Sequence, residues 1–558
     1  MTPSPSTSAL PDAPAEAEID SSCRLPLFVL FTGAATWVAL ASVFDLIASI
    51  KFHAPDFLTG CAWLTYGRVH AAAANALLYG FALQAGFGVG LRIFAQRGGA
   101  RVCQPGLIAL GGEIWNLGVL VGVVAILAGD STGFESLEMP RYAALILSLA
   151  YLLIGLWTVL TLRRRREPGL AAPQWFLLAA LFWFPWIYST ANLLLLAFPV
   201  RGVEQSVIAW WYSNNLTVVW LSLVGLAAIF HLLRKDAGSH ARSGGCQTAA
   251  VSEADGGRGS ERTALTPPLS HAMGEGGAAL AGPGEGRLIG NDYRPLFAFW
   301  TLIVFGSWVG IPSTAPAPVW MPTLSTIATV LLLVPLLTVA VIVCGTLTPP
   351  PSHRMGEGGP ALPGPAEGGG LPSSSSSSSS AASYPAVRFV KFGVAAWLIA
   401  GAMKIVAVLP GVSPFIQFTW FTAAQSLLNG YGFFAMTMFG AIYCMMPGVA
   451  GVDWPLPKVV RAHFWCSAIG VLLLVVPLAI GGVVQGIQLN NAEIVFMDLT
   501  KATLPYLRVS TLGNALILLG NSLLIGNLLG LSARYGWAHF VPVYRSMTRG
   551  PATMEVPS

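Results

Sequence analysis

The stretch WLTYGRVHAAAANALLYGF (Trp63–Phe81) leads from a polar loop into an apolar run. From Ala71 onward the run is long enough, at about 20 residues, to cross the roughly 30 Å hydrocarbon core of a bilayer as an α-helix. The whole chain has the same character, with 558 residues of which 54% are hydrophobic and only 10% charged. A water-soluble protein cannot bury this much apolar surface. The composition therefore predicts a polytopic membrane protein whose first partner is the lipid bilayer.

Twelve apolar runs of similar length follow one another along the sequence. They are continuous rather than alternating, which predicts α-helices and excludes a transmembrane β-barrel. We therefore expect an all-α bundle of twelve transmembrane helices. The runs begin near Leu25, Ala71, Gly106, Tyr142, Gln174, Ser206, Leu296, Met321, Phe392, Phe415, His463 and Thr511.

Basic residues gather in alternate loops, which orients the predicted helices. Arg163–Arg166 follow the fourth run, and Lys458 and Arg461 lie between the tenth and eleventh. The opposite loops carry acidic residues or little charge. By the positive-inside rule both termini are expected on the cytoplasmic side. The formal net charge of +5 is then explained by the basic loops on the cytoplasmic side. It does not indicate a nucleic-acid partner, and none is expected.

Two long segments between helices are rich in Gly, Pro and Ser and have no apolar period. They contain similar sequences, LTPPLSHAMGEGGAALAGPGEG (Leu265–Gly286) and LTPPPSHRMGEGGPALPGPAEG (Leu347–Gly368). Neither offers the apolar face that a folded repeat would stack, so both are predicted to be disordered cytoplasmic inserts. The predicted organisation is a disordered tail (1–24), helices 1–6 (25–235), the first insert (236–293), helices 7–8 (294–346), the second insert (347–386), helices 9–12 (387–535) and a C-terminal tail (536–558).

The opening stretch closely resembles the second transmembrane helix of catalytic subunit I in the cbb3-type heme–copper oxidases. That family has GR-x-R-P-x-H-x-N there, and its histidine ligates the low-spin heme. Gly67, Arg68 and Asn75 keep the pattern, whereas Ala73 occupies the heme-ligand position. The resemblance extends over nearly all twelve runs and implies the same bundle in a bacterial cytoplasmic membrane.

Further matches carry the other metal-ligand positions. WWYSNN (Trp210–Asn215) resembles the family's WWYGHNA, so Asn214 stands where a histidine ligates copper. FWTLIVFGSWVG (Phe299–Gly310) resembles the helix with a cross-linked tyrosine, which places Gly306 at the tyrosine. The adjacent histidine pair of that helix falls at Pro312 and Ser313.

The tenth run ends in GAIYCMMP (Gly440–Pro447), which resembles the family's GALYHLIP. Counting back from it, the H-x-H that ligates both hemes falls on Gln425 and Leu427. RAHFW (Arg461–Trp465) and GGVVQG (Gly481–Gly486) are further scaffold matches. No histidine lies between His271 and His353, or between His353 and His463.

The family implies two b-type hemes, copper and sometimes calcium, but every metal-ligating histidine is replaced here. Alanine and leucine supply no donor, and Gln and Asn amides bind iron and copper weakly. The seven cysteines form no C-x-x-C motif. The sequence therefore predicts no cofactor and favours a chain that is not itself an enzyme.

A few residual candidates are left. His70, one helical turn before Ala73, is a weak candidate for a shifted heme ligand, with a polar role at the helix start as the alternative. Glu135 and Glu138 resemble the family's outer acidic pair, which binds calcium beside a heme propionate. A solvated loop is the alternative for them.

Glu113 and Lys404 fall in or near apolar runs, where a charge is costly and usually faces an interior cavity. Either residue could mark a water or proton path, or could extend to the membrane surface instead. The space of a missing heme is expected to be filled in part by apolar side chains, namely Leu427, Leu428, Phe433 and Phe434.

Three functional hypotheses follow. The first is a non-catalytic homologue that acts as a scaffold or partner of other membrane subunits, among them cytochrome c-type subunits. The second is a working heme-containing oxidase or electron-transport subunit with unconventional ligands. The third is a transporter, channel or sensor built on the same helices.

Overall fold

The computed structural model describes residues 16–233, 293–312, 315–347 and 378–548, and all regular structure within these ranges is helical. Eleven helices are long and apolar enough to cross a membrane. A shorter apolar helix, α9 (Arg294–Gly306), accounts for the seventh expected span. The predicted all-α membrane bundle is confirmed, with one span shorter than the others.

Several spans consist of more than one helical segment, because π-helical stretches interrupt them. The described segments are α1 (Glu16–Lys51), η1 (Ala62–Leu64), α2 (Tyr66–Asn75), η2 (Ala76–Leu83), α3 (Gln84–Gly98), α4 (Pro105–Ala128), α5 (Arg141–Arg163), α6 (Ala172–Ala191), η3 (Asn192–Ala197), α7 (Val203–Asn214), η4 (Asn215–Trp220) with a helix continuing to Leu233, α9 (Arg294–Gly306), α10 (Trp320–Leu331), α11 (Leu333–Leu347), α12 (Ser378–Ala407), α13 (Ser413–Ile416), α14 (Trp420–Leu427), η5 (Leu428–Ala435), α15 (Met436–Ala450), α16 (Pro457–Leu489) and α17 (Phe496–Thr548).

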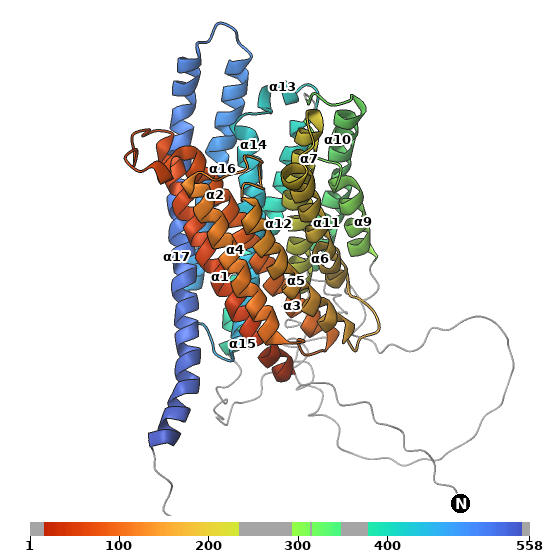
Figure 1. The fold of residues 1–558 in the computed structure, drawn as a ribbon, viewed down its shortest axis with the longest axis vertical. Coiled ribbons are helices and arrows are strands. Elements are labelled where there is room, and N and C mark those ends of the chain that lie inside the picture. Colours follow the sequence, from red (N-terminus) through yellow and green to blue (C-terminus); the bar gives the residue numbers. More distant parts are fainter. Residues whose placement is uncertain (1–15, 234–292, 313–314, 348–377, 549–558) are drawn as a thin grey trace, which may run out of the picture.

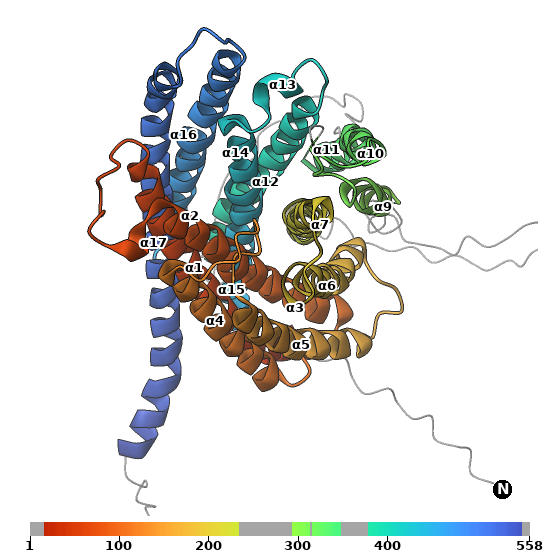
Figure 2. The same cartoon turned by 45° about the horizontal axis from the view of Figure 1, so that its top comes forward.

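The bundle has two ends, which we call proximal, where α1 begins, and distal, where α1 ends. In Figure 1 the proximal end is at the bottom, and α17 extends beyond the other helices there. Figure 2 shows α16 and α17 at one side of the bundle and α9, α10 and α11 at another, with α1, α2, α12, α14 and α7 between them. Helices from both halves of the sequence therefore surround the middle of the molecule.

The helices that face outward show the surface expected in lipid. On α4, Leu110, Leu117 and Leu120 are exposed, whereas Trp115 and Val119 are completely buried. Exposed positions recur every three or four residues, which is the spacing of one helix face. Apolar side chains on that outer face suit a hydrocarbon surrounding.

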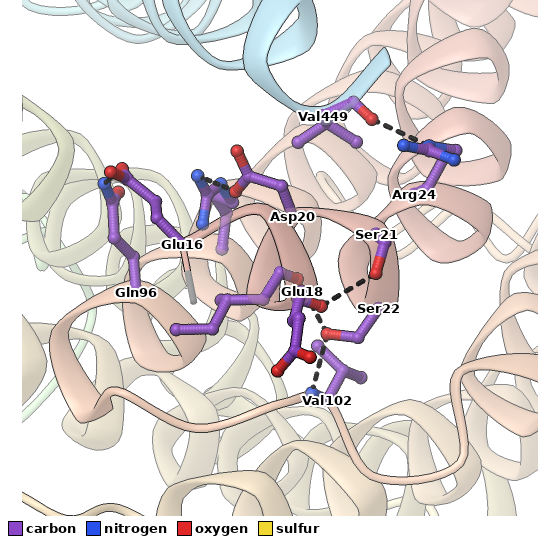
Figure 3. A network of polar contacts seen from close by, with 11 residues as sticks. Glu16, Glu18, Asp20, Ser21, Ser22, Arg24, Gln96, Val102 and Val449 are labelled. Atoms are coloured by element: carbon purple, nitrogen blue, oxygen red, sulfur yellow. Dashed lines mark hydrogen bonds and ion pairs between the residues drawn. The ribbon is translucent and has the colours of Figure 1, made fainter. Parts of the chain in front are cut away.

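The start of α1 differs from the prediction, because the helix begins at Glu16 although a tail was predicted through residue 24. Figure 3 shows the polar contacts that hold these first turns. Asp20 forms a buried ion pair with Arg92 of α3. Arg24 Nε donates to the carbonyl of Val449 at 2.8 Å, and Ser22 Oγ accepts from the Val102 amide at 3.0 Å. Tertiary contacts thus order a segment whose composition predicts a tail.

Two other predicted boundaries also differ. α12 begins at Ser378, inside the second predicted insert, and α17 continues to Thr548, through most of the predicted C-terminal tail. Alanine favours the helical state in the Ser- and Ala-rich start of α12, and the helix continues through Pro385. The rest of the two inserts lies outside the described residues.

Close backbone contact holds α13 and α14 against α16 at the distal end. A Cβ atom added to Gly486 would lie 1.4 Å from the Phe415 carbonyl oxygen, and one at Gly482 would lie 2.0 Å from the Phe421 nitrogen. Only glycine allows this approach. The GGVVQG motif therefore positions the segment that carries Gln425 and Leu427.

Candidate functional site

Two adjoining cavities lie in the distal half of the bundle, with volumes of about 630 Å³ and about 320 Å³. Their walls come from α1, α2, α12 and α14 and from the loops that follow α4 and α9. Both sizes fall within the range usual for small-molecule sites. The residues that line both cavities are Asp45, His70, Ala74, Glu135, Gly310, Lys404, Gln425, Ser426 and Leu427.

The positions that the resemblance assigns to metal ligands meet at these cavities. Gln425 and Leu427 line both of them, Asn214 lines the smaller, and Pro312 lines the larger. Ala73 is fully buried, and its neighbour Ala74 lines both cavities. Ser313 lies outside the described residues. The fold thus brings together residues more than 300 positions apart in the sequence.

The helices that carry these positions turn irregular just beyond them. The π-helical segments η2, η4 and η5 begin within three residues after Ala73, Asn214 and Leu427 respectively. A π-helical turn widens the helix and is often found at functional sites. This feature was not predicted, because an extra residue in one turn leaves the apolar pattern almost unchanged.

Lys404 lies where α12 passes Asn214. Its ammonium donates to Asn214 Oδ1 at 3.4 Å, and Asn214 Nδ2 donates to the Gly306 carbonyl at 2.9 Å. A Cβ at Gly306 would lie 3.2 Å from Val219 Cγ2, so any side chain larger than hydrogen would require Val219 to shift by a few tenths of an ångström. Asn214 and Gly306, which the resemblance assigns to the copper ligand and the tyrosine, are therefore joined by a hydrogen bond, and the Lys404 ammonium lies beside them.

Asp45 of α1 is a site residue that the sequence analysis missed. Its Oδ2 accepts a hydrogen bond from the Tyr431 hydroxyl at 2.8 Å, and it lines both cavities. The available signal was a lone carboxylate within a long apolar run, the same signal that marked Glu113 and Lys404.

The loop between α4 and α5 brings its two glutamates to different surroundings. Glu135 lines both cavities. Glu138 accepts a hydrogen bond from Asn75 Nδ2 at 2.8 Å. Burial raises the pKa of Glu138 from its ordinary value of 4.5 to about 7, against the opposing effect of the Asn75 hydrogen bond. The loop is also held by Tyr79, whose hydroxyl donates to the Ser136 carbonyl at 2.7 Å.

The two remaining candidates lie in contrasting places. His70 lines both cavities, and its ring stacks on Tyr66 with the ring centroids 5.4 Å apart. Glu113 is exposed on α4 and contributes to neither cavity. Of the two residues proposed for an internal polar path, Lys404 faces the interior space and Glu113 faces outward.

The expected filling of the cofactor space is correct only in part. Leu428 and Phe433 are buried in the core and Phe434 is buried in the wall of the smaller cavity, but Leu427 borders both cavities. Open space is left beside it because the neighbouring positions hold small or polar side chains, such as Ala74 and Ser426.

We tested whether the present residues fit the cofactors of the family. A heme with two axial ligands would find alanine and leucine at the expected positions, with His70 as the one histidine in the cavity walls. A copper ion would meet the Lys404 ammonium beside Asn214, and like charges at this range repel strongly in a low-dielectric interior. The Lys404 ammonium lines the same cavities as Glu135, and its positive charge disfavours the binding of calcium at this glutamate. Heme, copper and calcium therefore fit these residues poorly.

Comparison with known proteins agrees with the predicted family and fold. The family model for cytochrome c and quinol oxidase polypeptide I matches residues 26–246 and 287–516. A cytochrome c oxidase subunit 1 homolog of Azorhizobium caulinodans is 21% identical over 88% of this chain and 79% of its own length. A cbb3-type cytochrome c oxidase subunit of Stutzerimonas stutzeri is 19% identical over 82% of this chain and 84% of its own length.

A solved heme–copper terminal oxidase dimer shares the fold, with a TM-score of 0.57 and 11% sequence identity over 91% of this chain and 84% of that one. The fold therefore defines a multi-span membrane protein of the heme–copper oxidase type. The chain belongs to the cytochrome c and quinol oxidase polypeptide I family. Its similarity to cbb3-type subunit I, inferred from the motifs, is confirmed.

Proposed function

We propose that this chain is a non-catalytic member of the oxidase subunit I family that serves as a scaffold or partner subunit in a respiratory membrane complex. The observation that supports the proposal is the Lys404–Asn214–Gly306 contact, in which an ammonium group lies 3.4 Å from the side chain at the position that the resemblance assigns to a copper ligand. Ala73 and Leu427 also support the proposal, because their side chains have no atom that can ligate a metal. The bundle itself is kept, and its exposed apolar faces suit lipid and other membrane subunits.

The proposal includes an orientation. The proximal loops carry Arg97, Arg101 and Arg163–Arg166, whereas the distal loops carry Asp130, Glu135 and Glu138. By the positive-inside rule the proximal end, with both termini, faces the cytoplasm. The two cavities then lie toward the outer side of a bacterial cytoplasmic membrane.

One observation favours the second hypothesis, a heme-containing subunit with unconventional ligands. His70 lines both cavities and supplies an imidazole beside the space that a heme would occupy. Substitution of His70 therefore separates the two functions.

The test is genetic complementation in the native host. Deletion of the gene should lower the amount of assembled, heme-containing oxidase complex on native gels of the membranes. The wild-type gene and the His70→Ala variant should restore it equally well, because a scaffold has no use for the ligand. Restoration by the wild type alone would support the heme-containing alternative, and an unchanged complex in the deletion strain would contradict the scaffold function.

A further inference from the structure

Lys404 places a positive charge in the walls of both cavities with little to balance it. Its one hydrogen bond to a described residue is the 3.4 Å contact with Asn214. Among the described residues, no ion pair links it to a carboxylate. Lys404 contacts Asn214 of α7 and lines both cavities, so its side chain points into the bundle although it lies only one turn before the distal end of α12. Extension to the distal surface therefore does not account for it.

Glu135 supplies the opposite charge at the same cavities, also without an ion pair among the described residues. Asp45 differs, because the Tyr431 hydroxyl already satisfies one of its oxygens. Glu135 is exposed and keeps its hydration, whereas Lys404 is half-buried, so its ammonium group gains more from a partner inside the cavity. The cavities thus present the Lys404 ammonium group and two carboxyl groups, those of Asp45 and Glu135, to whatever fills them.

We propose that the two cavities form a binding site for a small zwitterion, such as an amino acid or a betaine. Its carboxylate would pair with Lys404 and its cationic group with Glu135. Its apolar part would lie against Ala74, Leu77 and Phe81, which line the smaller cavity. The inference rests on the proposed function, because a heme in this space would leave no room for the ligand.

The larger cavity offers a way in from the distal surface. It is lined by Gln417 and Phe418, from the segment between α13 and α14, and by Trp420, the first residue of α14. Phe418 is 73% exposed, so the cavity wall continues to the surface of the protein. A water-soluble ligand can therefore reach Lys404 from the distal side without crossing the bilayer.

The experiment measures ligand binding to the purified full-length chain in mild detergent. L-Leucine and glycine betaine are the zwitterionic probes. Two analogues of leucine carry a single charge: 4-methylpentanoate lacks the amino group, and 3-methylbutylamine lacks the carboxylate group. We expect at least one zwitterion to bind saturably and to raise the melting temperature. Each single-charge analogue should bind at least about tenfold more weakly, since a charged contact is lost.

Substitutions then assign the binding to the two residues. Lys404→Met and Glu135→Gln should each weaken zwitterion binding at least about tenfold. Lys501→Met and Glu493→Gln, at exposed distal positions outside both cavities, are matched controls that should bind like wild type. The analogue comparison uses only the wild-type chain, so it stands even if a variant fails to fold.

Three results would overturn the inference: no binding of either zwitterion, equal binding of the single-charge analogues, or unchanged binding by both cavity variants. An absorption spectrum of the same sample separates this failure from that of the proposed function. A heme band would contradict the proposed function, whereas a heme-free chain that binds no zwitterion would contradict the ligand site alone.

Discussion

Asn214 and Lys404 are 190 residues apart in the sequence, yet their side chains meet in the middle of the membrane protein. The substitution at Asn214 could be predicted, because WWYSNN lies beside a recognisable motif. The contact with Lys404 could not, since it depends on how α12 packs against α7. Lys404 itself could be predicted to be unusual from its charge alone.

Glu138 gives a prediction at this scale. Its pKa is raised to about 7 in the folded chain, so the folded protein keeps a proton there that the unfolded chain loses near pH 4.5. The free energy of unfolding should therefore fall as the pH rises from about 4.5 to about 7, by at most about 1.4 kcal/mol per pH unit. Above pH 7 this contribution should be constant.

Thermal unfolding in detergent across this range measures the effect. Glu138→Gln keeps an acceptor for Asn75 and removes the titration, so the pH dependence should become flatter than in wild type. Glu493→Gln, in an exposed distal loop, should keep the wild-type slope. Equal slopes for all three proteins would show that the surroundings of Glu138 are wrongly described.

At the scale of the elements, the helix types could be predicted and several helix ends could not. The apolar runs fix the position of each span because any membrane helix must bury or face lipid with apolar side chains. Helix ends such as the start of α1 depend on single polar contacts with distant residues. The π-helical segments near Ala73 and Leu427 leave no signal in the apolar period.

The start of α1 allows a matched test. Asp20→Asn removes one partner of the buried ion pair with Arg92 and should lower the free energy of unfolding by about 3–5 kcal/mol. Glu18→Gln removes the partner of the exposed pair with Arg101 and should cost less than about 1 kcal/mol. Denaturant unfolding in detergent compares the two. Equal small effects would mean that residues 16–24 behave as the tail that their composition predicts.

At the scale of the whole molecule, the fold could be predicted almost completely, since composition and periodicity specify a bundle of membrane helices. The positions that the resemblance assigns to metal ligands lie around one pair of cavities in the structure, although their role stays a prediction. The cavities and Asp45 were missed, because the volume inside a bundle depends on how its helices pack together. The small and polar residues Ala74 and Ser426 keep this space open, although the apolar content of the spans suggested a filled core.

The central claim is that the family's bundle persists here without its metals. The measurement that tests it most directly is a reduced-minus-oxidised absorption spectrum, with iron and copper analysis, of the purified wild-type chain and of His70→Ala. We predict no heme band and no stoichiometric iron or copper in either protein, because the cavity walls lack the necessary ligands. A heme band with about one iron per wild-type chain that disappears in His70→Ala would contradict the claim and make His70 a heme ligand.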